Sequence, residues 1–318
     1  MTMTEQISVG IITKNRKKLL LKLLKELIHF IDTNQIKEII IAEGSDPNEK
    51  LNNEDIEKFT SYINKVVILK STGEEAFGRN LVLKYCNTKW LCFLDDDCIP
   101  KKNIFNTFYQ FIRSDNDNNI GLVCGLTYFT GEETKAFKAC YLTPFIYPFK
   151  IALNKNNPDW GPTVCALFNT NALSNNQRFN TNCPVPVSGT DVDIGIRLNK
   201  IGYKVLMCPN AIVYHSTDTW KSLKGNIKRF FIWGRSEVFL VENHPSSILN
   251  GNIHWLRDII KGQKRVSKKR KFSIIEYLFS FLYLFVNTCG YFYQSARNKN
   301  IQNIFKRFKY YKCEYMNL

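Results

Sequence analysis

Residues 90–97 read Trp-Leu-Cys-Phe-Leu-Asp-Asp-Asp, and this stretch decides the predicted fold. Five consecutive apolar residues predict a buried strand, and the three acids that follow mark its carboxyl end. Adjacent carboxylates repel one another, and the next basic residue in the sequence is Lys101. A bound divalent cation would relieve the repulsion, and Mg²⁺ or Mn²⁺ prefers such oxygen ligands. The alternative is a helix N-terminus with Pro100 in its first turn, where acids are also favoured.

The residues before this strand alternate between apolar runs and helical patterns. Runs at 7–13, 38–42 and 66–69 predict three further strands. Helices are predicted at 17–31, 52–63 and 74–87, the first from apolar residues at positions 20, 23, 24, 27, 28 and 31. Strands that alternate with helices predict an α/β fold, with a Rossmann-like, mostly parallel sheet and helices on both faces.

Three polar clusters follow predicted strands. They are Thr13-Lys14-Asn15-Arg16, Glu43-Gly44-Ser45 and Asp95-Asp96-Asp97. In open α/β sheets, ligands bind at the carboxyl ends of the strands. We therefore expect these clusters to meet in one cleft.

The second half of the chain has a weaker pattern. Residues 119–170 are rich in aromatic residues, Gly and Pro and predict an irregular region suited to binding an acceptor. A helix is predicted at 191–200 and short strands at 204–207 and 211–214. Neither a GxGxxG dinucleotide fingerprint nor a P-loop occurs.

The charge of the chain is uneven. The net charge is +16, yet residues 1–220 carry 25 Lys and Arg against 23 Asp and Glu, whereas residues 221–318 carry 19 against 5. Because the basic residues lie far in sequence from the acids, a nucleic-acid-binding role is not expected. The ten cysteines form no CxxC pair, and the start MTMTEQ is no secretory signal. These features predict reduced thiols in a cytosolic domain.

Residues 272–293 form an apolar segment with a single charge, Glu276. As a helix it would be about 33 Å long, enough to cross a bilayer. Basic residues flank it on both sides, which favours a helix lying at the surface of an anionic membrane. A soluble helix packed on the catalytic domain and a single spanning helix are the alternatives. Its polar residues fall on one side at helical spacing: Ser273, Glu276, Ser280, Tyr283, Asn287 and Gln294.

The ordered set of motifs over residues 7–240 resembles the family 2 glycosyltransferases of GT-A fold. The matching pieces are 11–16, 43–45, 78–80, 93–97, 189–193, 202–205 and 209–211 with His215. The resemblance implies a catalytic domain at 1–245, with a nucleotide-binding half at about 1–115 and an acceptor half at about 116–245. Residues 246–318 would form a membrane-associating helical region.

The resemblance also implies a nucleotide-sugar site. Its expected residues are Thr13, Asn15, Arg16, Glu43, Ser45, Arg79, Asp95 and Asp96. Glu43 stands where the family usually has Asp, one methylene shorter, for the base or ribose. Arg16 and Arg79 have an alternative interpretation as surface residues of helices.

The metal and catalytic assignments follow from the same resemblance. Asp97 corresponds to the last acid of the DxD motif, which binds Mn²⁺ or Mg²⁺, and Asp95 and His215 are further candidate ligands. Asp191 corresponds to the acid that deprotonates the acceptor hydroxyl, with Asp193 as a competing base. Asp191 has a helix N-cap and His215 a structural histidine as alternatives.

Acceptor contacts are expected from Trp160, Gly189, Thr190 and Asp193, with a core tryptophan as the alternative for Trp160. Thr190 stands where the family usually has Glu. The predicted function is inverting, metal-dependent transfer of a sugar from a nucleotide-diphosphate sugar, a UDP-sugar by preference. The acceptor would be a saccharide or lipid-linked glycan of the cell envelope or a polysaccharide, at the cytoplasmic face of the membrane. The alternatives are a nucleotidyltransferase and a non-catalytic nucleotide-sugar-binding protein.

Overall fold

The computed structural model describes residues 6–30, 35–60, 66–114, 119–146, 149, 158–174, 178–184, 189–245, 259 and 270–300. The chain forms two compact units. The first comprises residues 1–129, 149–181 and 190–216, and the second comprises 130–148, 182–189 and 217–318. The domain boundary predicted at residue 245 stays a prediction.

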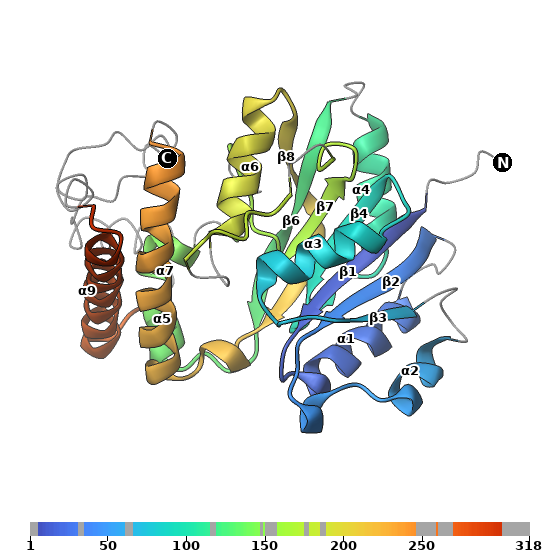
Figure 1. Ribbon diagram of the computed structural model, residues 1–318. Helices are drawn as coiled ribbons and strands as arrows, with labels where there is room; N and C mark the ends of the chain where they lie inside the picture. The colour runs from blue at the N-terminus through green and yellow to red at the C-terminus, as the bar shows by residue number, and fades with distance from the viewer. Residues whose placement is uncertain are drawn as a thin grey trace. The chain divides into compact units, whose positions relative to one another are not determined.

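The first unit is built on an eight-stranded mixed sheet with the order β3-β2-β1-β4-β7-β6-β8-β5 (Figure 1). β1 pairs in parallel with β2 and β4, and β2 pairs in parallel with β3. β7 is antiparallel to both β4 and β6, and β5 is antiparallel to β8. The elements are β1 (Ile7–Thr13), α1 (Lys17–Phe30), β2 (Ile36–Glu43), a 3-10 helix (Pro47–Glu49), α2 (Asn53–Thr60), β3 (Val66–Lys70), α3 (Glu75–Tyr85), β4 (Trp90–Asp95), β5 (Cys98–Pro100), α4 (Ile104–Ser114), β6 (Ile120–Thr130), β7 (Cys165–Asn169), α6 (Thr190–Lys200) and β8 (Lys204–Ser216).

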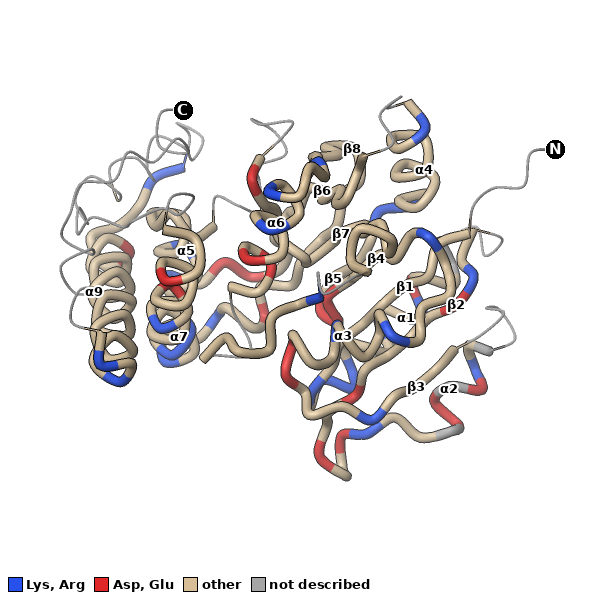
Figure 2. The backbone as a smooth tube through the Cα atoms, turned by 45° about the horizontal axis from the view of Figure 1, so that its top comes forward, with Lys and Arg blue, Asp and Glu red and all other residues tan. Residues whose placement is uncertain are grey.

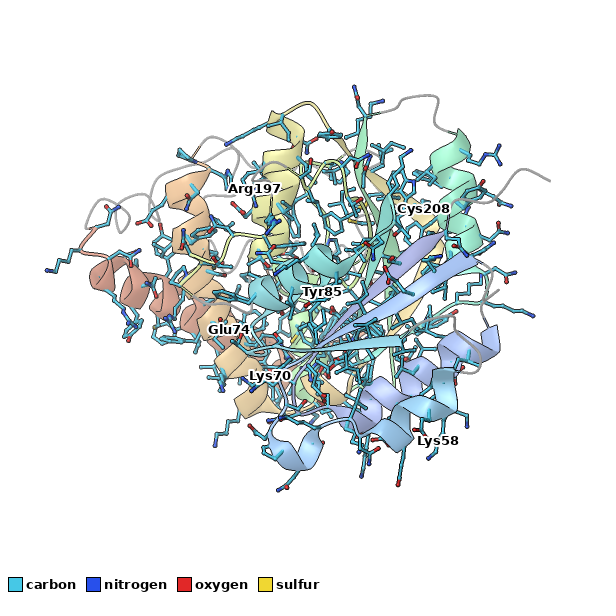
Figure 3. All side chains as sticks on the ribbon, turned by 45° about the vertical axis from the view of Figure 1, so that its right-hand side comes forward. Lys58, Lys70, Glu74, Tyr85, Arg197 and Cys208 are labelled. Atoms are coloured by element: carbon cyan, nitrogen blue, oxygen red, sulfur yellow. The ribbon has the colours of Figure 1, made fainter. Side chains whose placement is uncertain are left out.

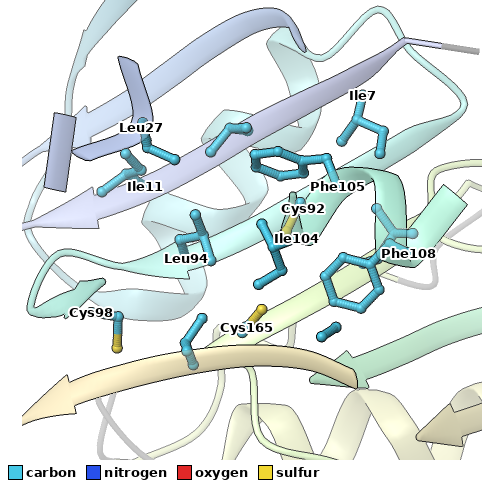
Figure 4. Close-up of a cluster of buried hydrophobic side chains, with 14 of the residues drawn as sticks. Ile7, Ile11, Leu27, Cys92, Leu94, Cys98, Ile104, Phe105, Phe108 and Cys165 are labelled. Carbon is cyan, nitrogen blue, oxygen red and sulfur yellow. The ribbon is translucent and has the colours of Figure 1, made fainter. Parts of the chain in front are cut away.

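The core lies between one face of this sheet and helices α1 and α4. Alternate residues of β1 and β4 enter it, as the two-residue period of a strand requires. The apolar stripe predicted on α1 is confirmed at positions 20, 23, 24 and 27, which are buried; position 28 is partly buried, and position 31 lies outside the described residues. Figure 4 shows part of the cluster, including Ile7, Ile11, Leu27, Cys92, Leu94, Cys98, Ile104, Phe105, Phe108 and Cys165.

Helix α3 covers the opposite face of the sheet. A Cβ on Gly78 would meet Ile12 side-chain atoms at 3.0 and 3.1 Å, and one on Gly10 would meet Val82 at 2.7 Å. The helix therefore lies tightly against β1, with its first turn near the carboxyl ends of the central strands. The predicted α/β sheet with helices on both faces is confirmed.

The prediction of an irregular region over residues 119–170 is wrong, because β6 and β7 lie within it. Glycines interrupt the apolar pattern of β6, so the sequence does not predict this strand. A Cβ on Gly121 would meet Tyr203 at 2.8 Å, and one on Gly125 would meet the Ala211 carbonyl oxygen at 2.5 Å. Glycine is thus required by packing, although it weakens the strand pattern. The short strands predicted at 204–207 and 211–214 are one strand, β8.

The second unit is helical. Its elements are α5 (Lys135–Cys140), a 3-10 helix (Asp218–Trp220), α7 (Leu223–Asn243) and α9 (Ile274–Arg297). α7 and α9 pack so closely that a Cβ on Gly234 would lie 1.8 Å from the Asn287 carbonyl oxygen, and one on Gly290 would lie 2.1 Å from the Phe231 carbonyl oxygen. Glycines on both helices therefore permit the contact.

The polar side of α9 faces the interior of this unit. Glu276, Ser280, Asn287 and Gln294 are at most 4% exposed. The outward side is apolar, with Ile274 75%, Leu278 61%, Phe285 51% and Tyr293 50% exposed. Figure 2 shows that α9 carries almost no charge between its ends. The predicted polar stripe exists, but it is a packing surface.

Candidate active site

The loops after β1 and β2 are joined by a compact set of hydrogen bonds. The Asn15 backbone N–H donates to Ser45 Oγ at 2.9 Å, and Asn15 Nδ2 donates to Asp46 Oδ2 at 2.8 Å. Asn15 has φ 56°, a left-handed conformation that asparagine tolerates. The neighbouring loop after β3 lies so close that a Cβ on Gly44 would be 2.1 Å from the Gly73 nitrogen. The predicted convergence of strand ends is therefore present in the first unit.

The acids after β4 contact the loop after β1. Thr13 Oγ1 donates to Asp96 Oδ2 at 2.8 Å, and Arg16 Nη1 donates to Asp96 Oδ1 at 2.9 Å. The same guanidinium nitrogen lies 3.4 Å from Asp97 Oδ2. The sequence suggested that no nearby base compensates these acids, but Arg16 does so from 80 residues away. Asp96 thus has both carboxylate oxygens engaged within the protein.

Asp97 also faces His215, which β8 places opposite Cys98 of β5. His215 Nε2 lies 3.4 Å from Asp97 Oδ1. The other ring nitrogen, Nδ1, is 2.8 Å from the Ser216 carbonyl oxygen, which cannot donate, so Nδ1 carries the proton in this contact. In the uncharged form of the ring, the lone pair is then on Nε2, toward Asp97. Asp97, Cys98 and His215 form a buried group whose ligand atoms lie within 4.8 Å of one another.

The electrostatic balance of these acids is negative. Burial raises the pKa of Asp95 to about 6, assisted by the charge of Asp97 and opposed by Arg79 and His215. Burial also raises the pKa of Asp96 against the opposing effect of Arg16. A site in which burial and like charge oppose ionisation favours an added cation.

Helix α3 contributes a second basic residue. Arg79 is only 4% exposed, and its guanidinium lies 5.4 Å from the centre of the Phe179 ring. Arg79 Nη1 donates to Thr190 Oγ1 and to Glu75 Oε2, each at 3.1 Å. Arg79 is therefore a buried residue that connects α3 to α6, and its alternative interpretation as a surface residue of a helix does not hold.

Asp191 and Asp193 occupy the first turn of α6 but differ in their surroundings. Asp193 is 1% exposed and pairs with Arg197, whose Nη2 lies 2.8 Å from Asp193 Oδ2; Arg197 is labelled in Figure 3. Asp191 is half-buried, and within the part of the chain that the structure describes it accepts a local hydrogen bond from the Val192 backbone N–H at 2.9 Å. Burial raises the pKa of Asp191 to about 6, with Arg79 opposing and Glu75 reinforcing the shift. A carboxylate of this pKa suits proton transfer near neutral pH.

The remaining predicted residues lie at the edge of this arrangement or outside it. Glu43 is buried, and its Oε1 accepts from the Leu51 backbone N–H at 3.0 Å. Trp160 is half-buried and packs against Gly195 of α6. Thr190 is buried beneath Arg79. Gly189 belongs to the second unit, where it has φ 80° and lies beside Ser236.

Two polar residues of the site were not found from the sequence. Glu75 has a detectable signal, since it precedes Arg79 by four residues on one helix face. Cys98 has none, because its place beside His215 depends on the pairing of β5 with β8.

Comparisons with solved structures place the fold. A mannosyltransferase, PcManGT from Pyrobaculum calidifontis in complex with GDP-Man and Mn²⁺, matches with a TM-score of 0.56 and 12% identity, over 96% of this chain and 88% of that one. TarS 1-349 from S. aureus matches with a TM-score of 0.51 and 14% identity, over 96% and 93%. GalNAc-T7 with UDP, GalNAc and Mn²⁺ matches with a TM-score of 0.52 and 13% identity, over 84% and 57%. The predicted GT-A fold is thereby confirmed.

The sequence identifies the family to which the chain belongs, which is a narrower group than the fold. No curated protein matches the chain. The sequence profile of Glycosyl transferase family 2 matches residues 8–174, which include β1, the acids after β4 and β7. This match covers more than half of the chain and agrees with the fold and with the motifs at the strand ends. The chain therefore belongs to glycosyl transferase family 2.

Proposed function

We propose that this glycosyltransferase moves a sugar from a nucleotide-diphosphate sugar, a UDP-sugar by preference, to a saccharide or lipid-linked acceptor. The observation that carries the proposal is one unit that holds the Asp97–His215 pair and the half-buried Asp191, whose pKa is raised to about 6. The Asp97–His215 pair matches the needs of a diphosphate leaving group, and Asp191 matches those of a hydroxyl nucleophile. The product would belong to a cell-envelope glycan or a polysaccharide.

The proposed reaction is a single displacement. Asp191 accepts the proton of the acceptor hydroxyl as that oxygen bonds to the anomeric carbon. The bond from this carbon to the diphosphate oxygen breaks at the same time, and the electron pair leaves with the nucleoside diphosphate. Because the attack comes from the face opposite the leaving group, the anomeric configuration inverts. Asp193 is a poorer candidate for the base because Arg197 already occupies its carboxylate.

The donor set around Asp97 suits Mn²⁺ or Mg²⁺. It offers the Asp97 carboxylate, a histidine whose lone-pair nitrogen lies on the Asp97 side, and the nearby Asp95. A divalent cation there would neutralise charge on the departing diphosphate. We assign Asp97, Asp95 and His215 as its protein ligands, with oxygen and imidazole donors that fit Mn²⁺ particularly well.

The nucleotide would lie against the loops after β1 and β2. We assign its contacts to Thr13, Asn15, Arg16, Glu43, Ser45, Arg79, Asp95 and Asp96. Of these, Arg16 is 41% exposed and is a cation suited to phosphate oxygens. Within the first unit, acceptor contacts are assigned to Trp160, Thr190 and Asp193.

A donor screen tests the proposal. The full chain is incubated with UDP-, GDP- and dTDP-sugars in Mn²⁺ or Mg²⁺, and nucleotide release is measured with Asp191→Asn and Asp97→Ala as controls. We expect slow release from one nucleotide class, dependent on metal and on Asp97. Pyrophosphate exchange with a nucleoside triphosphate would instead identify a nucleotidyltransferase. Tight donor binding with no turnover, even with glycan acceptors, would identify a binding protein.

We further propose that the second unit binds an anionic membrane surface at the cytoplasmic face. By length and composition, α9 is the one described helix able to cross a membrane, with a mean hydropathy of 1.3. Its polar side chains and glycines face α7, whereas its outward side is apolar, the arrangement of helix pairs in lipid. Residues 221–318 also carry most of the net positive charge. Lipid contact would cover the outward apolar side, and basic residues would contact the headgroups.

Substitution of the outward side tests this membrane proposal. Leu278→Glu with Phe285→Glu should lower sedimentation with vesicles of phosphatidylglycerol and phosphatidylcholine at least tenfold, while leaving the melting temperature unchanged. Ile201→Glu, at a 48%-exposed isoleucine of the first unit, is the matched control. Salt should weaken wild-type binding without abolishing it. Equal binding of the double variant and the wild type would contradict the proposal.

A further inference from the structure

Glu75 is a carboxylate of the first unit to which neither the family relationship nor the proposed mechanism gives a role. It is the first residue of α3. Its Oε2 accepts from Arg79 Nη1, and that nitrogen also donates to Thr190 Oγ1, each at 3.1 Å. One buried guanidinium therefore connects Glu75 to the residue that directly precedes the proposed base, Asp191.

The side chain of Glu75 is held in place but remains accessible. It is 36% exposed, whereas the Arg79 side chain is 5% exposed. Within the described ranges, Arg79 is the partner of Oε2 and no donor contacts Oε1. Arg79 Nε is also buried without a hydrogen-bond partner among the described residues. A carboxylate oxygen with open acceptor positions beside an unsatisfied buried donor indicates a polar ligand at this point.

The charges around Glu75 indicate which part of a ligand it contacts. Glu75 interacts electrostatically with Asp95 and Arg16 on the donor side and with Asp191 on the acceptor side. It is therefore within electrostatic range both of groups assigned to the nucleotide and of the group assigned to the attacking hydroxyl, and Arg79 connects it to Thr190 beside that group. A negative side chain would repel the diphosphate, but it is a strong acceptor for sugar hydroxyls. The transferred sugar is the part of the donor that joins these two sides.

We propose that Glu75 accepts a hydrogen bond from a hydroxyl group of the transferred sugar and thereby contributes to donor selectivity. The inference rests on the proposed function, because it requires a nucleotide-sugar donor in the first unit. Arg79 fixes the carboxylate through Oε2 and leaves Oε1 for the sugar. The substrate class is then a sugar with a free hydroxyl at the contacted position, in contrast to a fully substituted one.

A comparison of sugar-bound and sugar-free nucleotides tests this assignment. Calorimetry in Mn²⁺ would measure the affinities of the wild type and Glu75→Gln for UDP, UDP-glucose, UDP-N-acetylglucosamine, GDP and GDP-mannose. For the nucleotide sugar that the wild type binds best, we expect Glu75→Gln to bind about tenfold more weakly, the typical effect of a hydrogen bond to a charged group. The affinity for the corresponding nucleoside diphosphate should change by less than about twofold.

Two variants and a modified donor complete the design. Glu74, labelled in Figure 3, lies one residue earlier at the same end of α3. Glu74→Gln should change neither the affinity for the nucleotide sugar nor the affinity for the nucleoside diphosphate. Glu75→Asp keeps the charge and should restore part of the sugar-dependent affinity. A deoxy donor that lacks the contacted hydroxyl should bind equally to the wild type and to Glu75→Gln, whereas the other deoxy donors should keep the difference.

The outcomes separate the inference from the function on which it rests. Equal weakening for nucleotide sugar and nucleoside diphosphate would overturn the sugar contact and assign Glu75 to the nucleotide or to folding. Unchanged affinities in Glu75→Gln would also overturn it, while leaving the proposed function intact. A folded wild type that binds none of the nucleotides would overturn the proposed function and the inference together.

Discussion

The two units each contain a cluster of buried polar side chains, but the clusters are balanced differently. In the second unit, Asn226 Nδ2 donates to the Trp220 carbonyl oxygen at 2.8 Å, and Asn287 Nδ2 donates to Glu237 Oε1 at 3.0 Å. Arg235 Nε donates to Gln294 Oε1 at 3.0 Å. Among the described residues of the first unit, five carboxylates converge on two guanidinium groups. They are Glu75, Asp95, Asp96, Asp97 and Asp191, with Arg16 and Arg79 as the bases.

This difference separates structural polar groups from functional ones. A buried polar cluster whose members satisfy one another holds helices in register, and its loss should lower stability. A cluster with surplus charge is unfavourable for the folded protein unless a ligand completes it. Substitutions in the charged cluster of the first unit should therefore lower activity more than stability.

The largest effect should come from Asp191→Asn. The amide cannot accept the acceptor's proton, so kcat should fall about 10²–10⁴-fold, with donor affinity nearly unchanged. The folded-state pKa of about 6 lies above the usual value of 3.8, so ionisation at neutral pH opposes folding. The variant should thus be more stable than the wild type, by about 1–3 kcal/mol at pH 7. Initial rates and urea unfolding would measure both.

Asp193→Asn provides the control two residues along the same helix. It leaves Arg197 without its carboxylate and should lower the free energy of unfolding, as expected of a balanced pair. A collapse of kcat in Asp193→Asn with near-normal turnover in Asp191→Asn would transfer the base to Asp193. NMR of the product should show inversion, and retention would exclude a single displacement.

Asp97→Ala should cause the next largest effect. It removes the oxygen that faces His215, so the gain in nucleotide affinity on adding Mn²⁺ should fall by about 10²-fold. Asp96→Ala should reduce that gain less, because its oxygens already accept from Thr13 and Arg16. Calorimetric titration of UDP and GDP with and without Mn²⁺ measures both variants. An unchanged metal dependence in Asp97→Ala would remove Asp97 from the metal site.

Gly234→Ala tests the packing of the second unit. The added methyl group would collide with the Asn287 backbone, so the unfolding free energy should fall by about 3 kcal/mol. Gly225→Ala on the same helix is the control, since its nearest neighbour would be 3.5 Å away and alanine favours a helix by about 1 kcal/mol. Thermal denaturation should separate the two variants. Equal melting temperatures would mean that α7 and α9 do not pack as closely as described.

The smallest effect is on the pH dependence of the rate. Asp191 must be ionised to act as a base, so kcat should fall below about pH 6 and be constant above it. Among the described residues, Arg79 and Glu75 of α3 and Cys124 of β6 interact electrostatically with it. Glu75→Gln removes a negative neighbour and should shift this limb to lower pH by less than about one unit. A limb that stays fixed in that variant would separate Glu75 from Asp191.

The fold was predictable where one physical signal dominated. The stripe of Leu20, Leu23, Leu24 and Leu27 and the apolar runs ending at Thr13 and Asp95 identify elements that bury one face or both. The sequence did not predict β6, because Gly121 and Gly125 are required by close contacts with Tyr203 and Ala211, which lie more than 80 positions away. Sequence patterns record local periodicity, whereas such contacts depend on the sheet order.

Only part of the site was predictable, because sequence patterns record local features and not contacts between distant residues. Acids and polar residues at strand ends identify Asp97 and Asn15, but nothing near Asp97 in sequence predicts Arg16 as its partner or Cys98 as its neighbour at His215. The side of α9 that faces the protein was also hidden. Periodicity shows that its two sides differ, but only the glycine contacts with α7 show which one packs inward.

Arg16 has a thermodynamic consequence for the order in which ligands bind. Its guanidinium already serves as a counter-ion to Asp96 and Asp97, so a metal ion bound at the proposed site without a nucleotide would compete with it for the same oxygens. A nucleoside diphosphate would offer the displaced guanidinium new oxygen partners and so restore the lost interaction. Each ligand would then strengthen the affinity for the other by the same factor, as linkage requires. Under the proposed function, the apparent metal affinity would thus be a joint property of ion and nucleotide, coupled through an arginine 80 residues away from Asp96.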